Sequence, residues 1–267
     1  MIMEGSDLAH TNSTSDSAVV KMRRRGRFVG KTWYSLAVFI ALEIFAVYSL
    51  IASTFSGTGQ DVMLCAISMV LYALPYIAEW LFRIHFSGVM EIMCMLFCIG
   101  PLFGSVHRLY FIIPCFDDIL HTYSGFIGAA IGFALPDLSD KQNQKHSFLL
   151  KCVSAFAISM SFAAVWEIFE YSADMLLGTD MQWDTMITNF SSYLVGGDMS
   201  IPPVISDIES VMINGEELWT GGYIDVGIID TMTDMIVCSA GTVAFVLLAA
   251  FSRGKLVCPF VAKYQSE

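Results

Sequence analysis

The sequence predicts an all-α fold, a polytopic transmembrane helix bundle of about six spans, and three observations lead to this class. Hydrophobic residues make up 55% of the 267 residues, and only 15% are charged, whereas soluble domains carry roughly 25% charged residues. The polar surface is too small to cover the chain in water, so a lipid bilayer is the solvent that suits it. The apolar residues also gather in runs close to the roughly 20 residues that a helix needs to cross a bilayer.

The expected spans follow one another along most of the chain. They cover residues 33–53, 62–82, 88–106, 113–135, 148–173 and 227–251. The first run is too long for the apolar region of a signal peptide, so we expect an uncleaved helix. Gly100, Pro101 and Gly104 interrupt the third run, and the fifth is long enough to tilt or to project from the membrane.

Lysine and arginine residues predict the orientation, because cytoplasmic loops carry an excess of them. With the N-terminus in the cytoplasm, all 14 of these cations except Arg108 lie on the cytoplasmic side. We therefore expect a protein of the plasma (inner) membrane with both termini inside. The expected domains are a disordered polar and basic tail over 1–31, a transmembrane domain over 32–252 with an external loop over about 174–226, and a cytoplasmic tail over 253–267.

Two classes of function are disfavoured by composition. The few cations are divided among short loops and the net charge is -11, so we expect no nucleic-acid partner. The seven cysteines contain no CxxC pair and fall mostly within apolar runs, which argues against a redox motif or a zinc knuckle. The long external loop is rich in acids; it is either a solvated lid or a cover over a site.

Acidic residues recur in three of the predicted spans, at the ends that the topology places outside. These pairs, three or four residues apart, are Asp117 with His121, Glu167 with Glu170, and Asp230 with Asp234. Residues at this spacing share a helix face. Ionisable groups in a membrane are costly and usually face a protein interior or a water-filled cavity. We therefore predict one site at the external ends of the fourth, fifth and sixth spans.

Packed carboxylates repel one another unless some stay protonated or a cation neutralises them. The spans offer no Lys or Arg for this, so we predict a divalent metal, with Zn, Mn, Fe and Mg all open. The predicted metal ligands are Asp117, His121, Glu167, Glu170, Asp230 and Asp234. His121 and Glu167 are also the predicted catalytic residues, because either could move a proton. Asp118, Asp174 and Asp225 fit the simpler role of groups that touch water at helix ends. The roles of Glu43, Glu79 and Glu91, in earlier spans, stay open.

These residues carry a resemblance to a known family. The blocks FDDILHTYSGF (116–126), WEIFEY (166–171) and DVGIIDTMTD (225–234) resemble those of the bacterial multi-pass inner-membrane proteins of the YjdF type, over roughly 88–250. The resemblance implies recurring polar residues at Asp117, His121, Gly125, Trp166, Glu167, Glu170, Asp174, Gln182, Asp230, Thr231 and Asp234. The chain departs from the family pattern at Asp118, and the resemblance implies no particular reaction. A more distant similarity is to the VanZ-like membrane proteins, which also have an acid four residues before a histidine at a helix start.

Three functions remain open from the sequence. The first is a membrane-embedded metal-dependent hydrolase or transferase, which would act at the outer face on a lipid or lipid-linked substrate and have membrane lipid as its other partner. The second is a transporter for a cation or a proton-coupled solute, with Glu43, Glu79 and Glu91 extending the path. The third is a non-catalytic membrane component. The sequence does not give the oligomeric state.

Overall fold

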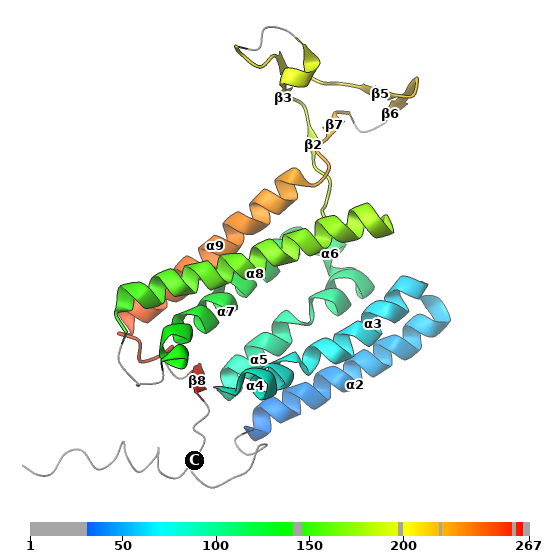
Figure 1. The fold of residues 1–267 in the computed structure, drawn as a ribbon. Helices are drawn as coiled ribbons and strands as arrows, with labels where there is room; N and C mark the ends of the chain where they lie inside the picture. The colour runs from blue at the N-terminus through cyan, green and yellow to red at the C-terminus, as the bar shows by residue number, and fades with distance from the viewer. Residues whose placement is uncertain (1–30, 141–145, 197–199, 219–220, 258–259, 264–267) are drawn as a thin grey trace, which may run out of the picture.

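The structure, a computed structural model, describes residues 31–140, 146–196, 200–218, 221–257 and 260–263. Its helices form two groups, one from the first half of the chain and one from the second half (Figure 1). The tail predicted over 1–31 lies outside the described residues except for Lys31. Each group carries its own cluster of acids.

The first group consists of helices that precede residue 113. They are α2 (Trp33–Ser56), α3 (Gly59–Tyr72), α4 (Leu74–Phe82), α5 (Gly88–Phe97), the π-helix η1 (Pro101–Val106) and the short α6 (Leu109–Ile112). Helix α2 packs against α3 and α5, and α3 packs against η1. Ala46, Cys65, Tyr72, Cys98 and Leu102 are buried in the core between them.

Two runs that the sequence predicts as single spans are irregular. The run over 62–82 is broken at Ala73 into α3 and α4, which are bent by 42° relative to one another. Pro75 lies in the first turn of α4, where its missing N–H costs nothing. In the run over 88–106, the α-helix ends at Phe97 and a π-helix begins at Pro101, in the segment where the sequence predicts an interruption.

The second group is a three-helix unit of α7 (Phe116–Ser139), α8 (Phe148–Leu177) and α9 (Ile228–Phe251), in which α7 contacts both partners. Glycines allow this close packing. A Cβ atom on Gly125 would overlap the carbonyl oxygen of Cys238 in α9, and one on Gly241 would overlap that of Thr122 in α7. Small residues at helix contacts are typical of membrane bundles, because they let backbones approach.

The connection between α8 and α9 contains short strands that the sequence did not predict. The antiparallel pairs are β2 (Met186–Ile187) with β7 (Tyr223–Ile224), β3 (Phe190–Ser191) with β4 (Val204–Ile205), and β5 (Val211–Ile213) with β6 (Glu216–Leu218), and the 3₁₀ turn η2 spans Tyr193–Val195. This connection projects beyond the ends of α8 and α9 (Figure 1). It begins where Gly178 ends α8 with a φ of 65°, a conformation that glycine adopts without strain.

The described part of the C-terminal segment folds back onto the bundle. Strand β8 (Val261–Lys263) pairs antiparallel with β1 (Ile84–Phe86), which lies between α4 and α5. Val257 and Val261 are buried in the core that α7 and α9 share with β1. This segment therefore ties the end of the three-helix unit to the first group of helices.

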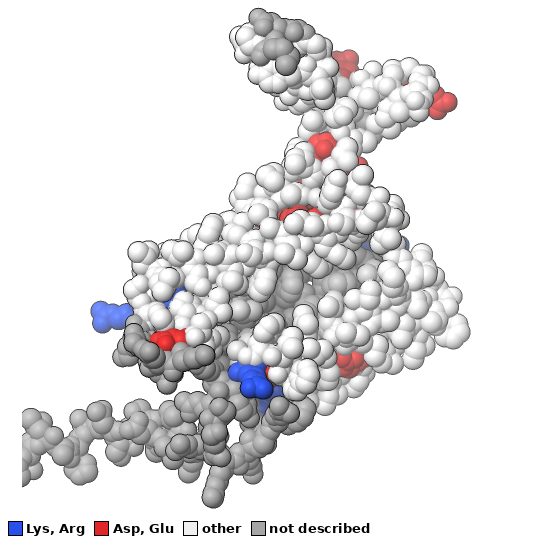
Figure 2. Space-filling model, viewed as in Figure 1, with Lys and Arg blue, Asp and Glu red and all other residues white. Residues whose placement is uncertain are grey.

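Five of the described helical segments are each long and apolar enough to cross a membrane, and α3 with α4 makes a sixth when the bent pair is taken as one span. The predicted fold class, an all-α polytopic bundle of about six spans, is confirmed. Lys and Arg side chains lie mainly at the lower end of the helices in the view of Figure 2, and acidic side chains also occur towards the upper end. The same uneven distribution of Lys and Arg in the sequence is the basis for the predicted orientation, with both termini in the cytoplasm.

Candidate functional site

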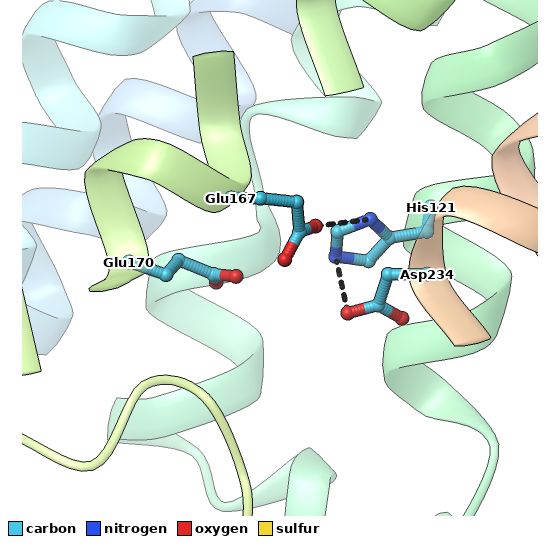
Figure 3. A group of neighbouring side chains, drawn as sticks. All are labelled: His121, Glu167, Glu170 and Asp234. Carbon is cyan, nitrogen blue, oxygen red and sulfur yellow. Dashed lines mark ion pairs between the residues drawn. The ribbon is translucent and has the colours of Figure 1, made fainter. Parts of the chain in front are cut away.

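The site lies at the end of the three-helix unit where α7 begins, α8 ends and α9 begins. His121 of α7, Glu167 and Glu170 of α8, and Asp234 of α9 are all buried there (Figure 3). The chain alternates direction from one helix to the next, so acid pairs far apart in the sequence reach the same depth. The structure thus brings together residues of all three pairs that the sequence singled out.

The imidazole of His121 lies between carboxylates on both of its nitrogens (Figure 3). Nδ1 is 3.9 Å from Oε1 of Glu167, and Nε2 is 3.5 Å from Oδ2 of Asp234. These separations are too long for good hydrogen bonds. An ion binds one imidazole nitrogen, so either separation, but not both at once, matches the spacing of two ligand atoms that each lie about 2.1 Å from a shared metal ion.

Several oxygens of this cluster lack a partner. Both carboxylate oxygens of Glu167, Oε2 of Glu170 and Oδ2 of Asp234 are buried and accept no hydrogen bond. Among the described residues, no ion pair joins a Lys or Arg to these acids. A buried polar group without a partner costs about 1–3 kcal/mol, and a charged one costs more. The donor set suits a cation, because His121, Glu167, Glu170 and Asp234 each offer one ligand atom within 4.8 Å of the others.

A second group of acids lies beside the first and shares one residue with it. Asp117, Asp230 and Asp234 each offer an oxygen within 4.8 Å of the other two. Asp117 and Asp230 are only half-buried, whereas Asp234 is 2% exposed. Oδ1 of Asp117 is 3.8 Å from Nε2 of His121, so the two groups meet at this ring. All six predicted ligands therefore lie in one continuous cluster.

Two other acids at this end hold the backbone in place. Asp174 accepts hydrogen bonds from the hydroxyl of Thr179 at 2.7 Å and from the backbone N–H groups of Met181 and Gln182 at 2.7 and 2.8 Å. Asp225 accepts from the backbone N–H groups of Thr185 and Ile229, both at 2.7 Å. Both side chains are partly exposed at helix ends, as predicted, and their hydrogen bonds to the backbone give them a structural role as well.

These bonds fix a short segment, residues 179–185, across the start of α9; we call it the strap. The backbone N–H of Trp183 donates to Oδ2 of Asp230 at 3.1 Å, and the side chain of Gln182 donates to Thr231. The Trp183 ring lies against Phe111 and Tyr110 of α6, with ring centroids 5.2 and 6.4 Å apart. The strap therefore joins α6, α8 and α9 at the half-buried side of the cluster.

Tyr110 borders the cluster from α6, outside the membrane-spanning helices. Its ring fills the space beside Gly104, where a Cβ atom would overlap it. Burial, followed by the nearby carboxylate of Asp117, raises the pKa of Tyr110 above its ordinary value, so the hydroxyl keeps its proton. Neither Tyr110 nor Trp183 could be assigned to the site from the sequence, because aromatic residues near span ends are common in membrane proteins.

Below the cluster, the three helices meet in a small hydroxyl layer and then in an apolar core. The hydroxyl of Thr242 donates to Ser159 at 2.7 Å, and Ser159 donates to the carbonyl oxygen of Gly125 at 3.1 Å. Further along, Phe245 of α9 contacts Phe126 and Phe133 of α7 edge-on, with centroids 5.2 and 5.7 Å apart. The cluster is thus closed by hydrocarbon on this side.

The acids of the first helix group lie in a different environment. Glu79 and Glu91 both pair with Lys31, and Ser35 donates a hydrogen bond to Glu91. The backbone N–H of Phe86 also donates to Glu79, at 2.7 Å. These two acids lie at the other end of the helices and are not part of the candidate site.

The fold and the cluster together define the class: a multi-pass α-helical membrane protein with a buried acid and histidine cluster at one end of its bundle. The chain belongs to the family described as predicted membrane protein (DUF2238), which matches residues 34–255. The resemblance to proteins of the YjdF type is thereby confirmed, whereas the similarity to VanZ-like proteins stays a prediction. No curated protein and no solved structure matches the chain.

Proposed function

We propose that this protein is a membrane-embedded, metal-dependent hydrolase or transferase that acts on a lipid or lipid-linked substrate. One observation carries the proposal: three buried carboxylates without hydrogen-bond partners for their inward oxygens converge on one imidazole. A divalent cation held there would neutralise the acids, lower the pKa of a bound water and polarise a phosphoryl or carbonyl oxygen. Zn, Mn, Fe and Mg all suit a set of carboxylates with one imidazole.

The roles of the protein groups follow from their positions. In a hydrolysis, the oxygen of water forms a bond to the phosphorus or carbonyl carbon of the substrate, and the bond to the leaving oxygen breaks. The proton that water loses passes to Glu167 and from there to the leaving oxygen. Glu167 suits this task because one of its oxygens can bind the ion and the other can take the proton, whereas an imidazole that binds the ion through one nitrogen already carries a proton on the other.

An apolar hollow on the surface of α7 would suit a lipid substrate. It has a volume of about 320 Å³ and is lined by Asp118, Ile119, Thr122 and Tyr123. Its wall is largely hydrocarbon, which matches an acyl or polyprenyl chain. The same helix carries Asp117 and His121 of the cluster.

The transport alternative needs a polar path through the bundle. Beyond the hydroxyl layer, however, the site is closed by the rings of Phe126, Phe133 and Phe245. Glu79 and Glu91, which could have extended a path, are paired with Lys31 in the other helix group. The one-sided position of the cluster therefore favours an enzyme.

The test is an activity and metal measurement on the full-length protein in detergent and in proteoliposomes. Wild type, loaded with Zn²⁺ or Mn²⁺, is incubated with phosphatidic acid or a polyprenyl diphosphate, and products are followed by mass spectrometry. We expect turnover that requires metal, is lost in Glu167→Gln and persists in Glu217→Gln, which changes an exposed acid of β6. A wild type that retains no metal would overturn the proposal, and so would turnover that is equal in all three proteins.

A further inference from the structure

The two groups of acids share Asp234, and this suggests more than one ion. The carboxylate of Asp234 belongs to the buried group with His121 and to the half-buried group with Asp230. It is 2% exposed, and its Oδ2 accepts no hydrogen bond. A carboxylate has two oxygens, so one such group can serve an ion on each side.

The helix periodicity places the two groups one above the other. Asp117 lies one turn before His121 on α7, and Asp230 lies one turn before Asp234 on α9. One helical turn is about 5.4 Å along the axis. The ligand atoms of each group lie within 4.8 Å of one another and Asp234 belongs to both groups, so two ions held there would share this carboxylate. Metal ions in two-metal sites lie about 3.5–4 Å apart.

The charge of the cluster also favours two ions. Five carboxylates contribute to the two groups: Asp117, Glu167, Glu170, Asp230 and Asp234. When all are ionised they carry five negative charges, so one divalent cation would leave three uncompensated in a poorly solvated site. Two divalent cations would leave one, which the N–H donated by Trp183 to Asp230 stabilises further.

We propose that the cluster holds two divalent cations, bridged by the carboxylate of Asp234. The inner ion would be held by His121, Glu167 and Glu170, and the outer ion by Asp117 and Asp230. The inference rests on the metal site of the proposed function and extends it to the two-metal class. Such sites stabilise both the attacking and the leaving oxygen when a phosphoryl group is displaced, so a phosphoester or diphosphate of a lipid is the substrate class that they suit.

The burial of the two groups gives the ions different accessibility. All four residues of the inner group are buried, whereas two of the three residues of the outer group are half-buried under the strap. The outer ion is therefore the one that exchanges with solution and has open positions for substrate. A chelator should remove it first and leave the inner ion in place.

The experiment uses Mn²⁺ as the probe, because two nearby Mn²⁺ ions are exchange-coupled and give a paramagnetic resonance spectrum unlike that of an isolated ion. Full-length protein in detergent is loaded with Mn²⁺, freed of excess metal, and assayed for manganese by mass spectrometry. For wild type and for the control Glu217→Gln, which changes an exposed acid of β6, we expect about two ions per chain and a coupled spectrum. For Asp230→Asn we expect about one ion and the spectrum of isolated Mn²⁺.

The outcomes separate this inference from the proposed function. One ion per wild-type chain, with an uncoupled spectrum, would overturn the two-metal centre and leave a single-metal enzyme. No retained Mn²⁺ in wild type would overturn both. The wild-type measurement tests the inference even if a variant fails to fold. A folded Asp230→Asn protein that still holds two coupled ions would also contradict the inference.

Discussion

The two helix groups each bury a set of acids, but they neutralise them differently. In the first group, Glu91 is 1% exposed and has Lys31 and Ser35 as partners. In the three-helix unit, Asp234 is 2% exposed, and its Oδ2 lacks a hydrogen bond. The chain thus provides its own cation for one buried cluster. Under the proposed function, the other cluster would take its cation from solution.

The comparison also separates structural acids from functional ones within a single protein. Acids paired with a lysine or with backbone N–H groups hold helices and loops together, as Glu79, Asp174 and Asp225 do. Glu167 and Asp234, which face one another across the imidazole of His121, do not hold helices or loops together in this way. Removing a partner should therefore destabilise the first cluster, and removing the metal should destabilise the second.

The largest effect is expected at Lys31. Lys31→Met would leave Glu91 buried without a cation and leave Glu79 with His85 and the N–H of Phe86, and breaking a buried pair costs about 4 kcal/mol. The free energy of unfolding, measured by circular dichroism of the full-length protein in detergent, should fall by about this amount. The control is Lys255→Met, because Lys255 is exposed. An equal loss in both variants would show that the Lys31 cluster is not what stabilises this group.

A smaller loss is expected when metal is removed from wild type. At a free metal concentration 100 times the dissociation constant, binding stabilises by about 2.7 kcal/mol. Adding a chelator to the metal-loaded protein should lower its thermal midpoint accordingly. The Lys31→Met protein should show the same drop on chelation, because this substitution lies in the other helix group. A midpoint that does not respond to the chelator would contradict metal binding at His121 and Asp234.

Gly241→Ala should have an intermediate effect. The added methyl group would overlap the carbonyl oxygen of Thr122, so α9 would have to move away from α7. Overpacking of this kind costs typically about 2 kcal/mol. Because Asp234 lies two turns before Gly241 on α9, the metal content should fall together with stability. A variant that lost stability and kept full metal content would show that the cluster tolerates a shift of α9.

The smallest effect is expected from the matched substitution in the first group, Gly59→Ala. A Cβ atom there would have no neighbour within 4 Å, and the position is in the first turn of α3. Alanine loses less backbone entropy than glycine in a helix, so stability should rise by about 0.5 kcal/mol. Thermal unfolding of the Gly59→Ala and Gly241→Ala proteins, measured side by side, gives the difference in stability between the two substitutions. A loss at Gly59 would mean that α3 has neighbours that the described residues do not include.

The spans were predictable because hydropathy and length suffice for them. The acid and histidine cluster was predictable as well, since helical spacing and the alternation of span direction bring Asp117, Glu167 and Asp230 to one end. The break at Ala73 and the strands of the α8–α9 connection were not. Both depend on local geometry and on pairings between distant residues that no short sequence pattern reveals.

The partners of individual acids were also beyond the sequence. Asp174 and Glu170 are four residues apart on one helix, yet Asp174 binds the strap and Glu170 faces the cluster. Likewise, nothing near Glu91 in the sequence indicates that Lys31 reaches it. Such assignments depend on which side chain arrives from another element, and only the tertiary structure determines that.

The pairing of β1 with β8 has a consequence for biosynthesis. A ribosome makes residues 84–86 early and residues 261–263 only after α9, so the two strands cannot meet until nearly the whole chain has been inserted. Until then, the backbone groups of β1 that pair with β8 lack this partner. Completion of this ribbon is therefore a late step of assembly. Premature termination before Val261 would release a chain whose helices are all present but whose two halves lack this tie.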